Sequence, residues 1–173
     1  MTKKKIYVTG MSGTGKTAIA ELLDKKGVHS ISIDEVEGLC VWRNKISDEV
    51  VEYEAELNED FIKAHDWICD VDYLQKLMSK KEGVVVVLGS ASNQKEYLAL
   101  FDEVLLLQCK PETFIERIKQ RKDNIFGKDE SAQKLILSWY KDFEDNLLKN
   151  GAIAVDANKP LATIVDEIMA RIE

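Results

Sequence analysis

The residues best suited to chemistry lie near the start of the sequence, in the segment Gly10-Met11-Ser12-Gly13-Thr14-Gly15-Lys16-Thr17. Its spacing, G-x-x-x-x-G-K-[ST], is that of a P-loop, a motif that binds nucleotide phosphates. The glycines allow a tight turn that directs successive backbone N–H groups toward one phosphate. We expect Lys16 to reach the β- and γ-phosphates of ATP and Thr17 to hold Mg²⁺. The predicted nucleotide-binding residues of this segment are Gly10, Ser12, Gly13, Thr14, Gly15, Lys16 and Thr17.

The residues on both sides of this motif agree with it. Ile6-Tyr7-Val8 predicts a strand that leads into the loop, and residues 18–23 have helical spacing after it. A helix N-terminus at this point adds further N–H groups to an anion site. A glycine-rich turn with an unrelated lysine is the alternative, but it does not require this strand and this helix.

Composition narrows the class of protein. The chain has 173 residues, of which 45% are hydrophobic and 32% charged, which suits a single globular domain over residues 1–173. The longest apolar run, residues 84–88, is too short to cross a bilayer, so we expect a cytoplasmic protein without a membrane partner. Cys40, Cys69 and Cys109 lack C-x-x-C spacing, which predicts reduced thiols rather than a zinc site.

The negative charge of the chain is concentrated in one segment. The formal net charge is −7, and residues 35–82 alone hold 13 acidic and 6 basic side chains. A nucleic-acid partner would require a basic stripe, and a polyanionic substrate would meet repulsion here. We therefore expect a small-molecule substrate and no nucleic-acid partner. As a separate expectation, the chain is a monomer or weak homodimer.

Apolar runs and amphipathic stretches alternate along the rest of the chain, which predicts a three-layer α/β/α fold around a parallel sheet. Further strands are predicted at residues 30–33, 84–88, 104–107 and 152–155. Helices are predicted at residues 17–26, 47–64, 72–81, 93–100, 111–121, 131–149 and 161–172.

Two segments interrupt this alternation. Residues 35–71 form an oversized connection after the second strand, and residues 122–130 form a polar loop within a helical stretch. Both begin where parallel strands end, which is the edge at which open sheets bind ligands. Large connections at that edge are usually functional.

Several features together carry a resemblance to a known family. They are the P-loop, Asp34 at the end of the second strand, the helix over residues 114–121, the short polar loop after it and the final segment from Val155 to Pro160. With these features the chain resembles the small P-loop kinases of the adenylate kinase and shikimate kinase kind over essentially its whole length. The resemblance implies a five-stranded parallel sheet in the order 2-3-1-4-5, with ATP and Mg²⁺ as cofactors. It also implies an acceptor-binding insert (residues 35–82) and a lid region (residues 117–130) over ATP.

The resemblance assigns roles to four charged residues near the phosphates. Asp34 would orient Mg²⁺ or accept the proton of the acceptor hydroxyl, with Glu35 as its substitute; a helix N-cap is the alternative for Asp34. Arg117 and Arg121 lie four residues apart on one helix face, and they would stabilise charge on the transferred group. For this pair the alternative is a solvated helix face.

Two further residues complete the predicted nucleotide site. Lys128, in the polar loop, would reach a phosphate when the lid closes. Asn158, in the final segment, is the other predicted nucleotide contact.

The insert departs from the family in ways that bear on the acceptor. No arginine follows the third strand, and Arg43 is the single arginine of the insert, which argues against a monophosphate or shikimate as acceptor. Polar groups interleaved with tryptophans suit an uncharged or cationic, hydroxyl-bearing molecule. The predicted acceptor-binding residues are Asp34, Glu35, Trp42, Arg43, Asp66, Trp67 and Asp70. The alternative is that both tryptophans only pack the insert onto the sheet.

The sequence thus predicts an ATP- and Mg²⁺-dependent kinase for a small metabolite, with Lys16, Asp34, Arg117 and Arg121 as catalytic residues. A nucleoside or nucleotide monophosphate kinase is the alternative within enzymes. A nucleotide-binding regulatory module or slow NTPase is the alternative from another class. An enclosed acceptor pocket would favour a kinase, and a flat apolar surface beside the loop would favour a partner-binding switch.

Overall fold

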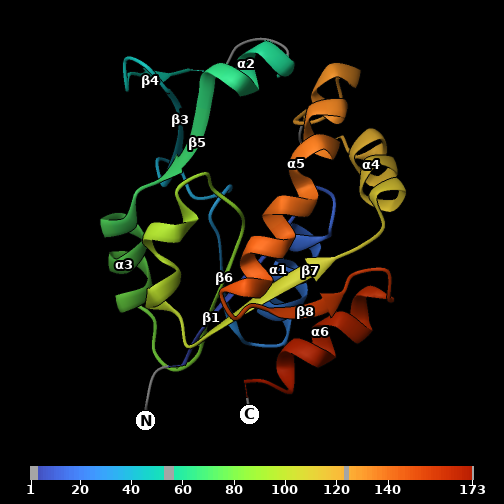
Figure 1. The fold of residues 1–173 in the computed structure, drawn as a ribbon. Coiled ribbons are helices and arrows are strands. Elements are labelled where there is room, and N and C mark those ends of the chain that lie inside the picture. The colour runs from blue at the N-terminus through green and yellow to red at the C-terminus, as the bar shows by residue number, and fades with distance from the viewer. Residues whose placement is uncertain (1–3, 53–56, 123–124, 173) are drawn as a thin grey trace.

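A five-stranded parallel sheet forms the centre of the molecule (Figure 1). The computed structural model describes residues 4–52, 57–122 and 125–172. Taken in chain order, the five strands have the predicted spatial order 2-3-1-4-5, because the sheet runs β2-β6-β1-β7-β8 and every pair is parallel. The strands are β1 (Lys5–Gly10), β2 (His29–Ser32), β6 (Val85–Leu88), β7 (Glu103–Gln108) and β8 (Ile153–Asp156).

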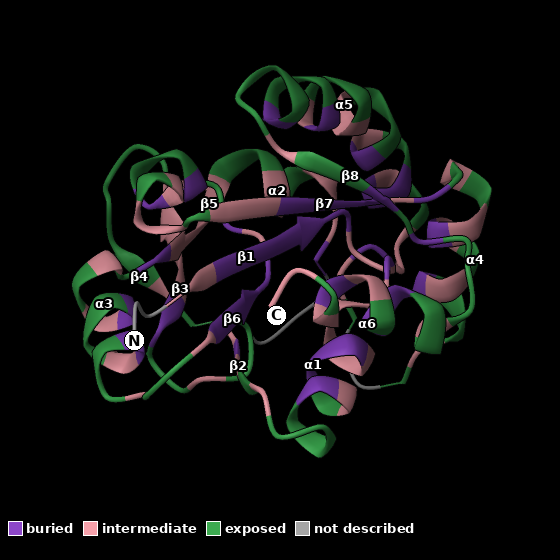
Figure 2. Ribbon diagram, turned by 90° about the horizontal axis from the view of Figure 1, so that it is seen from below, coloured by how far each residue is buried: buried purple, intermediate pink, exposed green. Residues whose placement is uncertain are grey.

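Helices cover both faces of this sheet, as predicted (Figure 2). On one face lie α1 (Lys16–Lys25) and α6 (Leu161–Met169). On the other lie α3 (Val71–Ser79) and the long α5 (Glu130–Lys149), while α4 (Pro111–Gln120) follows β7 at the rim. In β1, alternation directs Ile6 and Val8 into one hydrophobic cluster and Tyr7 into the other. No helix within the described residues is long and apolar enough to cross a membrane.

The insert differs from the sequence prediction. Residues 47–64 were predicted as one helix, but β4 (Val50–Val51) and the short α2 (Glu59–Ala64) occupy this stretch, with residues 53–56 outside the described part. The insert is built around a second, antiparallel sheet of order β4-β3-β5, in which β3 is Cys40–Asn44 and β5 is His65–Cys69. Within the described residues, only Glu59–Ala64 of the predicted helix forms, because Val50 and Val51 pair instead with Arg43 and Trp42 of β3.

The predicted helix at residues 93–100 is also wrong. Two 3₁₀ turns replace it, η1 (Gln94–Glu96) and η2 (Leu98–Leu100). Side chains of this segment turn inward onto the sheet: Tyr97 is fully buried, and its hydroxyl lies 3.1 Å from that of Tyr7. These inward contacts, rather than helical periodicity, determine its path.

Candidate functional site

The P-loop joins the end of β1 to the start of α1, and its glycines are required by its conformation. Gly10, Gly13 and Gly15 have φ values of +156°, +84° and +101°. A Cβ atom on Gly10 would lie 2.7 Å from the Leu107 carbonyl oxygen, and one on Gly13 would lie 2.6 Å from that of Phe114. The loop is therefore pressed against β7 and α4, and it leaves its other side open.

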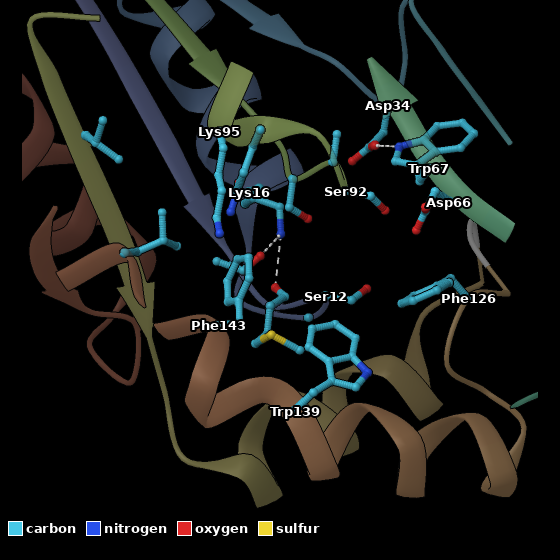
Figure 3. Close-up of a pocket in the computed structure, with 18 of the residues that line it drawn as sticks. Ser12, Lys16, Asp34, Asp66, Trp67, Ser92, Lys95, Phe126, Trp139 and Phe143 are labelled. Atoms are coloured by element: carbon cyan, nitrogen blue, oxygen red, sulfur yellow. Dashed lines mark hydrogen bonds between the residues drawn. The ribbon is translucent and has the colours of Figure 1, made fainter. Parts of the chain in front are cut away.

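Lys16 is held within this loop. Its Nζ donates hydrogen bonds to the carbonyl oxygens of Gly10, at 2.7 Å, and Met11, at 3.0 Å (Figure 3). Burial lowers the pKa of Lys16 to about 8, although the nearby Asp34 carboxylate raises it. The opposing effect of Asp34 shows that the ammonium and carboxylate groups share one electrostatic environment.

The hydroxyl side chains of the loop divide into two roles. Ser12 and Thr17 line a cavity above the loop, where a hydroxyl can meet a phosphate or a metal ion. Thr14 does not line it, because its buried hydroxyl donates to the Met11 carbonyl oxygen at 2.7 Å. The Thr14 side chain thus shapes the loop, and only its backbone remains for the predicted nucleotide contact.

This cavity has a volume of about 1680 Å³ and extends from the P-loop to the insert on one side and along α5 on the other. Small-molecule sites usually have volumes of roughly 300–1,000 Å³. The cavity therefore has room for a nucleotide and a second molecule. Its wall includes the predicted residues Gly10, Ser12, Gly13, Gly15, Lys16, Thr17, Asp34, Glu35, Trp42, Asp66, Trp67, Arg117 and Arg121.

Asp34 lies in the turn after β2, directly beside the P-loop cavity. The backbone N–H of Ile33 donates to the Leu88 carbonyl oxygen at 2.9 Å, which ties this turn to β6. Asp34 Oδ1 accepts a 2.8 Å hydrogen bond from the indole Nε1 of Trp67. Within the described residues no hydrogen bond is formed by the second carboxylate oxygen, Oδ2. Asp34 thus has one oxygen held by the insert and one available to a ligand.

The aromatic residues of the insert form a connected wall. Trp42 and Trp67 are directly paired across β3 and β5, with ring centroids 5.2 Å apart. Trp42 also stacks on Phe126, with ring centroids 6.3 Å apart, so the insert meets the segment that follows α4. Asp66 lies on the same wall and forms an ion pair with Lys45 at 3.7 Å.

Two predicted acceptor-binding residues do not line the cavity. Arg43 Nη1 donates to the Asp48 carbonyl oxygen at 2.9 Å, which holds it in the turn between β3 and β4. Asp70 caps α3 by accepting from the Tyr73 N–H at 2.9 Å. The structure places both side chains in local turn and capping contacts and outside the cavity wall.

The predicted arginine pair faces inward, although Arg117 alone lies on α4 and Arg121 is the extended residue that follows the helix. Arg117 donates to the Ala157 carbonyl oxygen through both Nη atoms at 3.2 Å, and its Nη1 lies 3.5 Å from the Gly13 carbonyl oxygen. Arg121 Nη2 donates to the Phe126 carbonyl oxygen at 2.9 Å. Both arginines line the cavity, whereas the alternative of a solvated helix face would place them outside it.

The remaining predicted nucleotide contacts lie outside the cavity wall. Asn158 accepts a 3.3 Å hydrogen bond from the Lys110 N–H and bonds to Asp156, next to the carbonyl that Arg117 contacts. Lys128 lies in the predicted lid, where its carbonyl oxygen accepts from Gln133 at 3.1 Å. Residues 123–124 of that lid are outside the described part of the chain.

The sequence prediction missed part of the wall. Lys95 extends into the cavity from η1 toward the region of Lys16, and Trp139 and Phe143 project from α5 on the opposite side (Figure 3). Ser92 lies between Lys16 and the insert. The i,i+4 spacing of the two aromatic residues was a usable signal for a shared face. No motif marks Lys95, because only the fold of the 3₁₀ segment brings it here.

The residues present fit a Mg²⁺ ion that keeps most of its water ligands. Thr17 and Asp34 both line the cavity and offer the oxygen donors that Mg²⁺ prefers. Within the described residues, no group of three or more His, Cys, Asp or Glu side chains is arranged as a dedicated metal site. Such a cage is not required, since Mg²⁺ at phosphate sites is bound by one or two protein groups and the phosphates.

Comparisons with known proteins agree with the fold. A sequence model of the family described as an AAA domain matches residues 6–137. The structure is similar to that of a shikimate kinase from Acinetobacter baumannii in complex with shikimate, with a TM-score of 0.60 and 20% identity over 99% of this chain and 93% of that chain. A gluconokinase from Sinorhizobium meliloti 1021 has a TM-score of 0.56 and 19% identity, over 98% and 91% of the two chains.

A deoxyadenosine kinase from M. mycoides with bound dATP is similar at a TM-score of 0.57 and 17% identity, over 97% of this chain and 98% of that chain. None of the curated proteins matches the sequence. The likenesses confirm the P-loop kinase fold that the resemblance implied. At 17–20% identity these similarities establish the fold and do not identify an acceptor.

Proposed function

Because the chain belongs to the AAA domain family, and because its P-loop opens into a cavity with room for a second molecule, we propose that it is an ATP- and Mg²⁺-dependent kinase. Its acceptor is a small, hydroxyl-bearing metabolite. The observation that carries the proposal is that Lys16 and Asp34 line the same cavity, so that a phosphate bound by the lysine and a hydroxyl bound by the carboxylate would share it.

In this proposal the P-loop and the arginines at α4 bind the phosphates of ATP. Backbone N–H groups at the start of α1 bind the β-phosphate, and Lys16 exchanges its carbonyl partners for phosphate oxygens. Arg117 and Arg121 line the cavity wall from which they can neutralise charge on the transferred group. Thr17, with Asp34 acting through a water ligand, would hold Mg²⁺, which would supply positive charge to neutralise that of the phosphates.

Asp34 is the residue that acts on the acceptor hydroxyl in this proposal. The acceptor hydroxyl oxygen forms the new bond to the γ-phosphorus, the bond from that phosphorus to the β–γ bridging oxygen breaks, and ADP leaves. Asp34 Oδ2 orients the hydroxyl and accepts its proton. Because the transition state is loose, the position of this carboxylate matters more than its basicity.

The insert selects the acceptor in this proposal. Its net charge of −7 over residues 35–82, together with Asp66 and the tryptophan wall, favours a neutral or cationic molecule. A nucleoside is the second candidate, supported by Trp139 and Phe143, whose rings could stack on a base. The space beyond the P-loop is a half-open cavity lined by polar and aromatic side chains rather than a flat apolar surface, which favours a kinase over a nucleotide-binding regulatory module.

The experiment is an acceptor screen. Nucleosides, sugars and amino alcohols are tested for conversion of ATP to ADP above the rate without acceptor, in the presence of Mg²⁺. Lys16→Ala is the control, since losing its contact with the developing charge costs about 10²-fold or more in rate while the fold remains. A panel without any acceptor-dependent turnover, or an equal rate in the variant, would contradict the proposal.

A further inference from the structure

The strand that carries Trp67 is fastened to the loop that follows β6. The backbone N–H of Ser92 donates to the Trp67 carbonyl oxygen at 2.7 Å. Two residues further along β5, the side chain of Asn93 binds both backbone groups of Cys69: its Oδ1 accepts from the N–H and its Nδ2 donates to the carbonyl oxygen, each at 2.9 Å. Asn93 therefore acts as a two-point clamp on the end of β5.

Asn93 supplies hydrogen bonds that the insert sheet does not give to the backbone of Cys69. Cys69 lies opposite Cys40 in the antiparallel pair of β5 and β3. The backbone hydrogen bond at this end of the pair, however, runs from the Asp70 N–H to the Leu39 carbonyl oxygen, at 2.8 Å. In an antiparallel pair the hydrogen-bonded positions alternate, so the N–H and C=O of Cys69 point away from β3. Cys69 is only 1% exposed, and without Asn93 both groups would be buried without a partner.

The other end of this chain of contacts is Asp34. Trp67, fixed between Ser92 and the clamp, donates its indole N–H to Asp34 Oδ1 at 2.8 Å. Three separate segments thus meet: the loop after β6, the insert strand β5 and the turn after β2. Figure 3 shows the indole and the carboxylate facing each other at the cavity wall.

We infer that Asn93 and Trp67 are positioning residues for Asp34. Asn93 fixes β5, β5 fixes the indole of Trp67, and the indole occupies Oδ1 so that Oδ2 faces the acceptor. This inference rests on the proposed function for the role of Asp34 in the reaction, but the chain of contacts can be tested without it. Small errors in the placement of a reacting group can cost large factors in rate, so a clamp remote from the acceptor has a catalytic consequence.

Indole N–H signals in a two-dimensional ¹H–¹⁵N NMR spectrum test the contacts directly. The chain has three tryptophans, and Trp67→Phe identifies the signal of Trp67. We expect that signal to exchange slowly with water and to shift in Asp34→Asn. In Asn93→Ala it should shift and exchange faster, while the signal of Trp139 on α5 stays unchanged. An unchanged Trp67 signal in Asn93→Ala would overturn the inference.

Two further variants secure this test. Glu96→Ala removes the other partner of the Asn93 amide, a carboxylate 3.0 Å away, and should leave the Trp67 signal in place. A shift as large as that of Asn93→Ala would show that the contact with Cys69 is not the one that matters. If Asn93→Ala unfolds the protein, Asn93→Asp is used for the same NMR test. This variant keeps the acceptor for the Cys69 N–H and loses the donor to the Cys69 carbonyl oxygen. A Trp67 signal unmoved by Asn93→Asp rejects the inference.

Turnover then separates positioning from general stability. With an acceptor from the screen, Asn93→Ala should lower kcat by roughly tenfold or more at an unchanged KM for ATP. In a Trp67→Phe background the same substitution should have no further effect, because both act on Asp34 in series. If the two substitutions instead lower kcat independently, so that their factors multiply in the double variant, the inference is contradicted. If the wild type shows no acceptor-dependent turnover, the proposed function fails, while the NMR result still decides whether Asn93 positions the Trp67–Asp34 pair.

Discussion

Lys16 donates a 2.7 Å hydrogen bond to the carbonyl oxygen of Gly10, six residues earlier in the same loop. The P-loop therefore holds its own lysine, and a bound triphosphate must replace carbonyl oxygens with phosphate oxygens as partners of this ammonium group. Since burial lowers the pKa of Lys16 to about 8, the free protein loses this positive charge at moderately alkaline pH.

The first prediction is that ATP affinity falls as the pH rises through about 8. A bound triphosphate stabilises the charged lysine and raises its pKa, so binding takes up a proton between the free and bound pKa values. Below pH 8 Lys16 already carries its proton, so ATP binding does not have to take one up. Calorimetry in two buffers of different ionisation enthalpy, at pH 7 and pH 9, measures the uptake. Lys16→Arg stays charged and should lose the proton uptake; an unchanged uptake in that variant would assign it to another group.

The second prediction concerns Gly89, at the end of β6. Its φ is +149°, and an added Cβ atom would lie 2.2 Å from Cγ1 of Ile33, the neighbour of Asp34. Gly89→Ala should therefore displace the turn that carries Asp34, reducing both stability and turnover. Overpacking of this kind costs about 1–3 kcal/mol.

Gly83→Ala is the matched control for this substitution. Gly83 also has a positive φ, +71°, but its Cβ position has no atom within 4 Å. Chemical denaturation should show a larger loss of unfolding free energy for Gly89→Ala than for Gly83→Ala, and only the former should lose turnover. Equal losses in the two variants would mean that backbone strain alone, rather than the contact with Ile33, limits position 89.

The third prediction is that ATP binding orders the lid region more than the sheet. Arg117 and Arg121 already line the cavity, and a γ-phosphate would draw them and the following segment together. Hydrogen exchange with a nonhydrolysable ATP analogue and Mg²⁺ should show new protection at the P-loop and across residues 117–130. Protection confined to the P-loop would leave the segment after α4 as an ordinary surface loop.

The fourth prediction is that neutral or cationic acceptors outperform monophosphates. The insert carries a net charge of −7 over residues 35–82, and its arginine, Arg43, bonds to Asp48 away from the cavity. The measurement compares kcat/KM for matched pairs, such as a nucleoside and its monophosphate. A monophosphate preferred by a wide margin would contradict this prediction and favour the nucleotide monophosphate kinase alternative.

The P-loop and the strands of the main sheet could be predicted from the sequence because their signals are local, whereas the strand order was implied by the resemblance to small P-loop kinases. Eight consecutive residues specify the loop, and short buried runs of valine and leucine specify each parallel strand. The connection topology of the related fold then places Asp34 beside Lys16. The loop and the individual strands depend on interactions within a few residues, so the linear pattern contains them.

The acceptor side was decided by tertiary structure. The pairing of Trp42 with Trp67 joins residues 25 positions apart, and the periodicity of the insert gave no sign of it. The contact of Trp67 with Asp34, the clamp of Asn93 on Cys69 and the entry of Lys95 into the cavity each join different elements. Such contacts are determined by how segments pack after they form. The sequence by itself determined the P-loop at which we expect phosphate to bind, and the packing of the insert against the sheet determined which side chains line the rest of the cavity.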